Sequence, residues 1–221
     1  MKMHTLYSIV SGPLVWVAVA VLVLGLTGRF FSLVILARKR DPMVYKYLSF
    51  KYSLRSIARW NTPYATRNMR LHPVVTAVSF LFHISLFAAP LFLLAHVVLF
   101  EEGIGFGYWT LPNQVADGLT VAVMAGLVFF GVRRVYAPEV RYVTSFKEHL
   151  LLLAILAPFL TGFLAYHQIG PYQPMLIAHM ITGEILLMII PFTWLSHMIL
   201  GFMIRAYMGS EFGGVRHARD W

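Results

Sequence analysis

The composition of this 221-residue chain excludes an ordinary soluble domain, because 59% of its residues are hydrophobic and only 12% are charged, against roughly a quarter charged in soluble domains. It has no cysteine, so disulfides, thiolate-held iron–sulfur clusters and covalently attached c-type haem are excluded within it. Its formal charge of +9 is more typical here of loops facing anionic headgroups than of nucleic-acid binding, and we expect no nucleic-acid partner.

Five apolar segments are each long enough to cross a hydrocarbon core of about 30 Å. They cover residues 11–37, 74–100, 113–135, 147–167 and 174–206. The first is followed by Arg38, Lys39 and Arg40 and not by a small-residue cleavage site, so we interpret it as a span and not as a signal peptide. The sequence predicts an all-α integral membrane protein, a five-transmembrane-helix bundle in which residues 1–221 form a single membrane domain.

The basic residues are distributed unequally between the two ends of these spans. Of the 18 lysines and arginines, all except Lys2 and Arg29 lie within or beside the loop at residues 38–73, the loop between the third and fourth spans, or the segment that ends with Arg219. Because positive residues are retained on the cytoplasmic side, we expect the N-terminus outside and the C-terminus in the cytoplasm. This orientation predicts a multi-pass protein of the cytoplasmic (inner) membrane with lipid as a partner, and residues 38–73 as a cytoplasmic loop.

Residues 44–60 of that loop mix basic side chains with aromatic and aliphatic ones. One interpretation is an amphipathic helix that lies on the membrane surface. The other is a docking surface for a cytoplasmic partner. The sequence favours neither over the other, and the two are compatible.

Histidines at matching heights in the second and fifth spans are the main functional signal, because ionisable groups at membrane depth are costly and usually functional. At 1.5 Å per residue, His83 lies roughly 13 Å and His197 roughly 12 Å from the inner ends of their antiparallel spans. His96 and His179 each lie roughly 6 Å from the outer ends. Eighteen residues make five helical turns, so His179 and His197 also share one face. The spacing predicts two level pairs, His83 with His197 and His96 with His179.

The directions in which His83 and His96 point from the second span agree less well with the two predicted pairs. Thirteen residues give about 220° on a straight helix, so His83 and His96 would point apart. Pro90 lies between them, and proline kinks helices. His72 is eleven residues before His83 and shares its face better, but it lies at the membrane edge, so it is the reserve ligand.

Two imidazoles at one height, one from each of two antiparallel helices, suit the axial positions of a b-type haem. The haem iron would be held by the four histidines, and two haems would make a conductor of electrons across the membrane. The alternatives are that the histidines bond to neighbouring helices or line a proton path, as in a proton-coupled or metal transporter, or that the chain is a non-redox membrane anchor. Transporters use paired broken helices, which the sequence pattern does not indicate.

Several segments resemble one membrane family. Residues 179–197 read HMITGEILLMIIPFTWLSH, a His-x3-Gly-x7-Pro-Phe-x4-His pattern. With LFH ending at His83, LAH ending at His96 and the stretch RRVYAPEVR, it resembles the nitrate reductase gamma subunit, a dihaem cytochrome b with five spans and its N-terminus outside. The stretches FLFHISLFAAPLFLLAH and TLPNQVADGLT are more similar to cytochrome b subunits of sulfate reducers' transmembrane redox complexes, the Tmc and Hmc types. This chain departs from the family by three additional residues between His83 and His96.

The resemblance implies an electron-transfer subunit with two haem b groups and not a complete enzyme. It assigns His83 and His197 to the inner haem, and His96 and His179 to the outer haem. It implies a periplasmic-side donor, either a quinol or a multihaem cytochrome c, and a cytoplasmic iron–sulfur subunit as acceptor. Menaquinone is the candidate quinone.

Two carboxylates in the outer halves of the spans are candidate quinone contacts. Glu184 is interpreted as a proton acceptor beside the outer haem or a quinone, or equally as a carboxyl that is kept protonated or paired. Asp117, with His167 and Tyr172, is a candidate boundary of a quinone pocket. The alternative for each of these is an ordinary interfacial polar residue.

Three arginines are candidate partners of haem propionates. They are Arg29 inside the first span and Arg133 and Arg134 at the end of the third span. Arginine suits carboxylates because it can form two parallel hydrogen bonds with them. The alternative is that these side chains reach to lipid headgroups.

Overall fold

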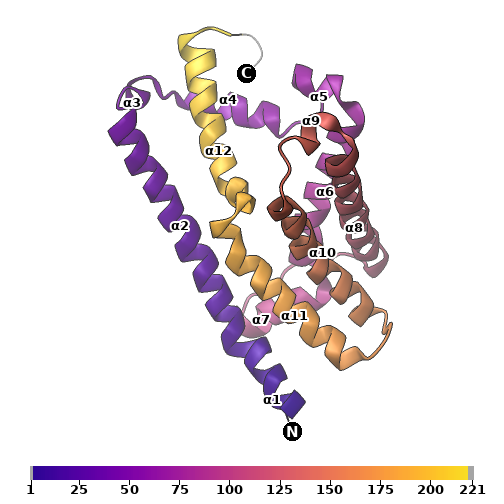
Figure 1. Ribbon diagram of the computed structural model, residues 1–221. Helices are drawn as coiled ribbons and strands as arrows, with labels where there is room; N and C mark the ends of the chain where they lie inside the picture. Colours follow the sequence, from indigo (N-terminus) through magenta and orange to yellow (C-terminus); the bar gives the residue numbers. More distant parts are fainter. Residues whose placement is uncertain (1, 219–221) are drawn as a thin grey trace. The chain divides into compact units, whose positions relative to one another are not determined.

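A computed structural model describes residues 2–218, so Arg219, one of the basic residues used for the orientation, lies outside the described residues. The described chain is 84% helical and contains no strand, which confirms the all-α prediction. Within it, five helices are long and apolar enough to cross a membrane (Figure 1). They cover His4–Arg40, Pro73–Phe92, Asn113–Tyr136, Phe146–Tyr166 and Tyr172–Phe192, and they follow the order of the five predicted segments.

The chain divides into two compact units. The first comprises Met1–Thr76 and Glu184–Trp221, and the second comprises Ala77–Gly183. Each boundary falls inside a long helix, so the second and fifth apolar segments both contribute to both units.

The first unit contains the N-terminal helices and the C-terminal part of the fold. Its elements are α1 (Lys2–Ile9), η1 (Val10–Leu14), α2 (Val15–Arg40), α3 (Val44–Tyr47), α4 (Phe50–Trp60), α5 (Arg67–Leu71), the end of α11 (Tyr172–Ile189), η2 (Ile190–Phe192), η3 (Trp194–Ser196), α12 (His197–Met208) and η4 (Gly209–Val215). Pro13 lies in η1, a π-helical turn between α1 and α2. Such turns accommodate a residue that has no backbone N–H, so the first apolar segment continues as helix across the proline.

The second unit contains most of α6 (Pro73–Phe92), then α7 (Leu94–Ile104), α8 (Asn113–Tyr136), α9 (Pro138–Arg141), α10 (Phe146–Tyr166) and the start of α11. Helices α8 and α10 pack against each other. The start of α10 is fixed by a capping box, in which Ser145 and Glu148 satisfy each other's backbone N–H groups. The ring of Phe82 on α6 lies edge-on to Phe130 on α8, with 5.3 Å between ring centroids.

The second and fifth apolar segments are both broken helices. Leu93 has an extended backbone (φ −69°, ψ 132°) between α6 and α7. Thr193 is also extended (φ −123°, ψ −178°) and separates the short 3-10 turns η2 and η3 that precede α12. The expectation that the chain lacks broken helices is therefore wrong. Each break follows a proline by two or three residues, Pro90 in one case and Pro191 in the other.

Large apolar side chains project from the long helices. Leu24 on α2 is 71% exposed and Val128 on α8 is 60% exposed. An extensive exposed apolar surface is suited to contact with lipid.

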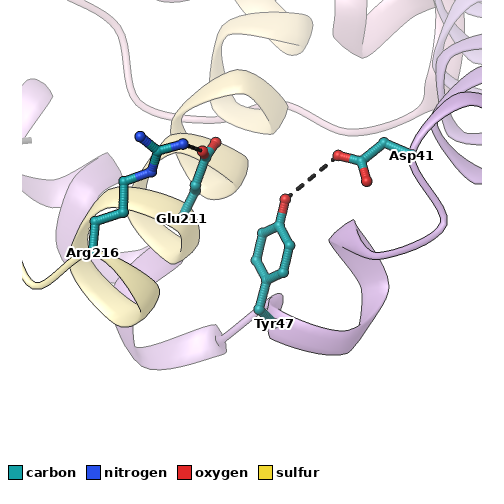
Figure 2. A network of polar contacts seen from close by, with 4 residues as sticks. All are labelled: Asp41, Tyr47, Glu211 and Arg216. Atoms are coloured by element: carbon teal, nitrogen blue, oxygen red, sulfur yellow. Dashed lines mark hydrogen bonds and ion pairs between the residues drawn. The ribbon is translucent and has the colours of Figure 1, made fainter.

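Figure 2 shows one polar contact within the segment that follows α2 and one at the C-terminal turn η4. The Tyr47 hydroxyl donates to Asp41 Oδ2 over 3.5 Å, and Arg216 Nη2 donates to Glu211 Oε1 over 2.6 Å. The rings of Tyr47 and Tyr207 lie 6.4 Å apart. Hydrogen bonding with Tyr47 and with Glu211 raises the pKa of Tyr207, because it favours the neutral phenol. These contacts fix the end of α12 in the first unit.

Helix α2 approaches the break in the fifth segment at Gly25. A Cβ atom on Gly25 would lie 2.6 Å from Pro191 Cβ, whereas a Cβ atom on Gly28, one turn later, would meet nothing within 4 Å. On the same side, Arg29 Nη1 donates to the Pro191 carbonyl over 2.7 Å. The glycine therefore allows the close approach that brings Arg29 to the broken backbone.

We expect Gly25→Ala to destabilise the protein by about 1–3 kcal/mol, because the added methyl group overpacks the contact with Pro191. The matched substitution Gly28→Ala should be neutral or stabilising by up to about 1 kcal/mol, because alanine favours a helix interior over glycine. Thermal unfolding of the two purified variants in detergent, followed by circular dichroism, measures the difference. Equal melting temperatures would contradict this packing.

Candidate functional site

The break in the second apolar segment is closed by hydrogen bonds from side chains and from a distant loop. A helix that stops leaves its last carbonyls without donors from its own backbone, and away from water such groups must be satisfied in another way. Three consecutive carbonyls at the end of α6 find donors here: Pro90 from His96 Nδ1 at 2.8 Å, Leu91 from the Tyr108 hydroxyl at 2.6 Å, and Phe92 from the Leu111 amide at 2.8 Å. The imidazole of His96 is therefore one of the caps of the helix that precedes it.

The break at Leu93 also changes the relative directions of His83 and His96, which were predicted for a straight helix. His96 is the third residue of α7, and His83 belongs to α6. Because the backbone is extended at Leu93, the straight-helix angle of about 220° does not apply to this pair. Pro90, the residue expected to perturb the helix, supplies the carbonyl that His96 binds.

His179 on α11 lies closely against α10. Its Nδ1 donates to the carbonyl of Pro158 over 2.8 Å. A Cβ atom on Gly162 would lie 2.7 Å from that nitrogen, so no larger residue fits beneath the ring. The hydroxyls of Thr161 and Thr182 lie 3.5 Å apart across the same two helices. The His179 ring is therefore held by a glycine below it and a carbonyl at its Nδ1 atom.

The rings of His96 and His179 lie close to each other and nearly parallel within the second unit. Their planes are 4° from parallel and their centroids are 5.8 Å apart. A carbonyl oxygen only accepts, so the bonds to Pro90 and Pro158 place the proton of each neutral ring on Nδ1 and leave the lone pair on Nε2. This is the form in which imidazole binds a metal, with a second partner orienting the ring. If both Nε2 atoms held one metal atom, with bonds of about 2 Å, the ring centroids would lie roughly 6 Å apart, close to the 5.8 Å found here.

His83 and His197 show the same Nδ1 hydrogen bond. His83 Nδ1 lies 2.7 Å from the Ser79 carbonyl, and His197 Nδ1 lies 2.9 Å from the Trp194 carbonyl. His197 begins α12, directly after the break in the fifth segment. The two residues belong to different units, so their pairing stays a prediction. His72, the reserve ligand, is exposed and ends α5 outside the long helices.

The three arginines predicted to meet propionates each have a partner in the chain. Arg29 binds the Pro191 carbonyl. Arg133 Nη2 lies 3.7 Å from Glu139 Oε1, and Arg134 Nη1 donates to the Thr144 hydroxyl over 3.4 Å. Arg29 thus stabilises a helix break, while the other two lie near the short helix α9.

The carboxylates predicted to contact quinone have different surroundings. Asp117 Oδ1 lies 3.3 Å from His167 Nε2, and both side chains are about one-third exposed, so the structure brings this predicted pair together. Tyr172 is exposed at the start of α11. Glu184 is 4% exposed, and neither carboxylate oxygen has a hydrogen-bond partner among the described residues.

Sequence reasoning missed three residues that shape these sites. Gly162 was detectable as the only glycine of the fourth apolar segment. Tyr108 gives no such signal, because nothing in the sequence links it to Leu91. Arg205, whose guanidinium lies 3.8 Å from the centroid of the Trp60 ring, was counted only as a cytoplasmic charge.

The fold and the site together define an all-helical protein with helices able to cross a membrane and a pair of parallel imidazoles. The chain is similar to a protein of Nitratidesulfovibrio vulgaris (strain Hildenborough) described as "Protein", with 38% identity over 211 residues that cover 94% of this chain and 93% of the relative. This chain belongs to the family of that bacterial protein. No protein-family model and no solved structure matches the chain.

Replacing Gly162 with alanine should displace the His179 ring and break its bond to Pro158. We expect a cost of about 1–3 kcal/mol from overpacking, and loss of the Nδ1-protonated signal of His179 in the ¹⁵N NMR spectrum of histidine-labelled protein. Gly183→Ala on α11, where an added Cβ meets nothing within 4 Å, is the control and should leave that signal unchanged. An unchanged spectrum for Gly162→Ala would contradict the contact.

Proposed function

We propose that this chain is a dihaem b-type cytochrome, the membrane subunit of a redox complex that carries electrons across the cytoplasmic membrane of a bacterium. The observation that carries the proposal is the pair of parallel rings of His96 and His179, 5.8 Å apart, each with Nδ1 bound to a carbonyl. The family resemblance in the segments around these histidines supports the same conclusion. The protein would be an electron-transfer subunit and not a complete enzyme.

A haem b would fit this pair because haem iron takes histidine side chains of the protein as ligands. His96 and His179 would hold the outer haem, and His83 and His197 the inner haem. When bound, the haem supplies a one-electron carrier. The chain's own residues orient the imidazoles: the carbonyls of Pro90 and Pro158 set the tautomer, and Gly162 makes room for one ring.

The membrane arrangement follows from charge and length. Five spans would put the two termini on opposite sides of the membrane, which the five long apolar helices support, and the basic loops favour a cytoplasmic C-terminus. The exposed apolar side chains of α2 and α8 support contact with lipid. The relative is a bacterial protein, and the charge distribution of the loops supports the inner membrane as the location.

The partners follow from the resemblance and from the charge distribution. The donor on the outer side would be a quinol, with menaquinone as the candidate, or a multihaem cytochrome c. The acceptor would be a cytoplasmic iron–sulfur subunit. The Asp117–His167 pair and the buried Glu184 are the groups that would contact a quinone or take up its protons.

A proton-coupled or metal transporter is the second candidate function. It is favoured by one observation, the breaks at Leu93 and Thr193, because transporters place their sites at interrupted helices. In that case the same histidines would bind a transported ion or proton directly. A non-redox anchor would leave them without such a role.

The reduced-minus-oxidised absorption spectrum of the purified chain separates these functions, because only the cytochrome shows b-type bands. We expect His96→Ala and His179→Ala each to remove one of the two haems in a pyridine haemochrome assay, which leaves about half the haem. His149→Ala, a histidine in the first turn of α10, is the matched control and should retain both. Unchanged haem content in both site variants would refute the ligand assignment, and absence of haem from the wild-type protein would refute the function.

A further inference from the structure

Helix α4 has one face that is fixed to the rest of the first unit. The buried hydroxyl of Ser53 donates to the Ala206 carbonyl over 3.0 Å and lies 3.0 Å from the hydroxyl of Ser210. The amide of Ser49, just before the helix, donates to the same Ser210 hydroxyl over 2.9 Å. Trp60 at the other end of α4 packs under the guanidinium of Arg205. These contacts hold the helix against α12 and η4.

The opposite face of α4 is exposed and is half apolar and half basic. Phe50 is 81% exposed and Leu54 is 53% exposed, and their spacing of four residues places them on one stripe of the helix. Lys51 and Arg55, each one residue later, form an exposed basic stripe beside it. Covering the apolar stripe with hydrocarbon would be favourable, because burial of a phenylalanine or leucine side chain is worth about 1.5–3 kcal/mol.

The position of α4 fits a membrane surface. In Figure 1, α4 runs across α12, the helix that continues the fifth apolar segment, and the two helices are in contact. Helix α4 also follows α2 closely in sequence, and α2 ends with three consecutive basic residues. A helix that crosses the end of a spanning helix lies in the plane of the interface.

We propose that the exposed face of α4 binds the anionic leaflet of the membrane. Phe50 and Leu54 enter the boundary between headgroups and acyl chains, and Lys51 and Arg55 meet the lipid phosphates. Apolar and basic stripes side by side are typical of helices that lie in the interface, whereas a docking site for a soluble acidic protein does not require the apolar stripe to be exposed to hydrocarbon. This assignment is independent of haem binding.

The absence of cysteine from the chain makes a site-specific test possible. Phe50→Cys and Leu54→Cys would each carry a unique nitroxide label in the otherwise complete protein, reconstituted in nanodiscs with phosphatidylglycerol. Asn68→Cys on α5, an exposed polar position in the same unit, is the control. Power-saturation EPR then compares collisions with oxygen, which concentrates in lipid, and with a water-soluble nickel chelate.

We expect the ratio of oxygen to nickel accessibility to be several-fold higher at positions 50 and 54 than at position 68. Nickel accessibility equal to that of position 68 would place the face in water and overturn the proposal. Shielding from both reagents would also overturn it, because the face would then be covered by a protein or a second copy of the chain.

A second comparison tests the preference for anionic lipid. Each basic residue near an anionic surface contributes about a fivefold preference, so Lys51→Gln with Arg55→Gln should move the label at position 54 towards water in phosphatidylglycerol discs. Arg141→Gln with Lys147→Gln, which removes the same charge from the second unit, should leave the label's depth unchanged. Equal depth in phosphatidylglycerol and phosphatidylcholine discs, unaffected by either pair of substitutions, would overturn the anionic specificity.

Discussion

The structure depends on satisfying backbone carbonyls at two breaks in apolar helices. In a segment without water, each unpaired carbonyl costs several kcal/mol, so a broken helix needs donors supplied from elsewhere. At the break before α12 the Pro191 carbonyl accepts from Arg29, and at the end of α6 the Pro90 carbonyl accepts from the imidazole of His96. The same hydrogen bond that caps the backbone fixes the ring's tautomer and leaves Nε2 as the atom able to bind a metal. One hydrogen bond, from a histidine Nδ1 to a backbone carbonyl, therefore both stabilises the helix break and prepares the histidine to bind a metal.

Glycines and an arginine hold this arrangement in place. Gly162 lets α10 lie directly beneath His179, and Gly25 lets α2 reach Pro191. Arg29 then satisfies the Pro191 carbonyl from another helix. A charged side chain such as Arg29 is costly at membrane depth. Its hydrogen bond to the Pro191 carbonyl at the helix break explains why an arginine lies inside the first apolar segment. The propionate contacts expected for Arg29 are not required to explain it.

Much of the fold was predictable from the sequence, because apolar length and helical rise are local properties. The five segments and the equal heights of His96 and His179 followed from counting residues. The breaks did not, since Pro90 and Pro191 signal a kink but the donors that permit a full break, Tyr108 and Arg29, lie far from them in the chain. The close contact of His179 with Gly162 was equally out of reach, because it depends on how α10 and α11 pack.

The most direct test of the central claim is the low-temperature EPR spectrum of the oxidised protein, purified intact. Two neutral imidazoles on one ferric iron give a low-spin signal, and its anisotropy reports the angle between the ring planes. With the His96 and His179 planes only 4° apart, we predict a rhombic low-spin signal that disappears in His179→Ala. A strongly anisotropic signal alone would contradict the parallel arrangement, and the lack of any low-spin ferric signal would contradict the paired-histidine site itself.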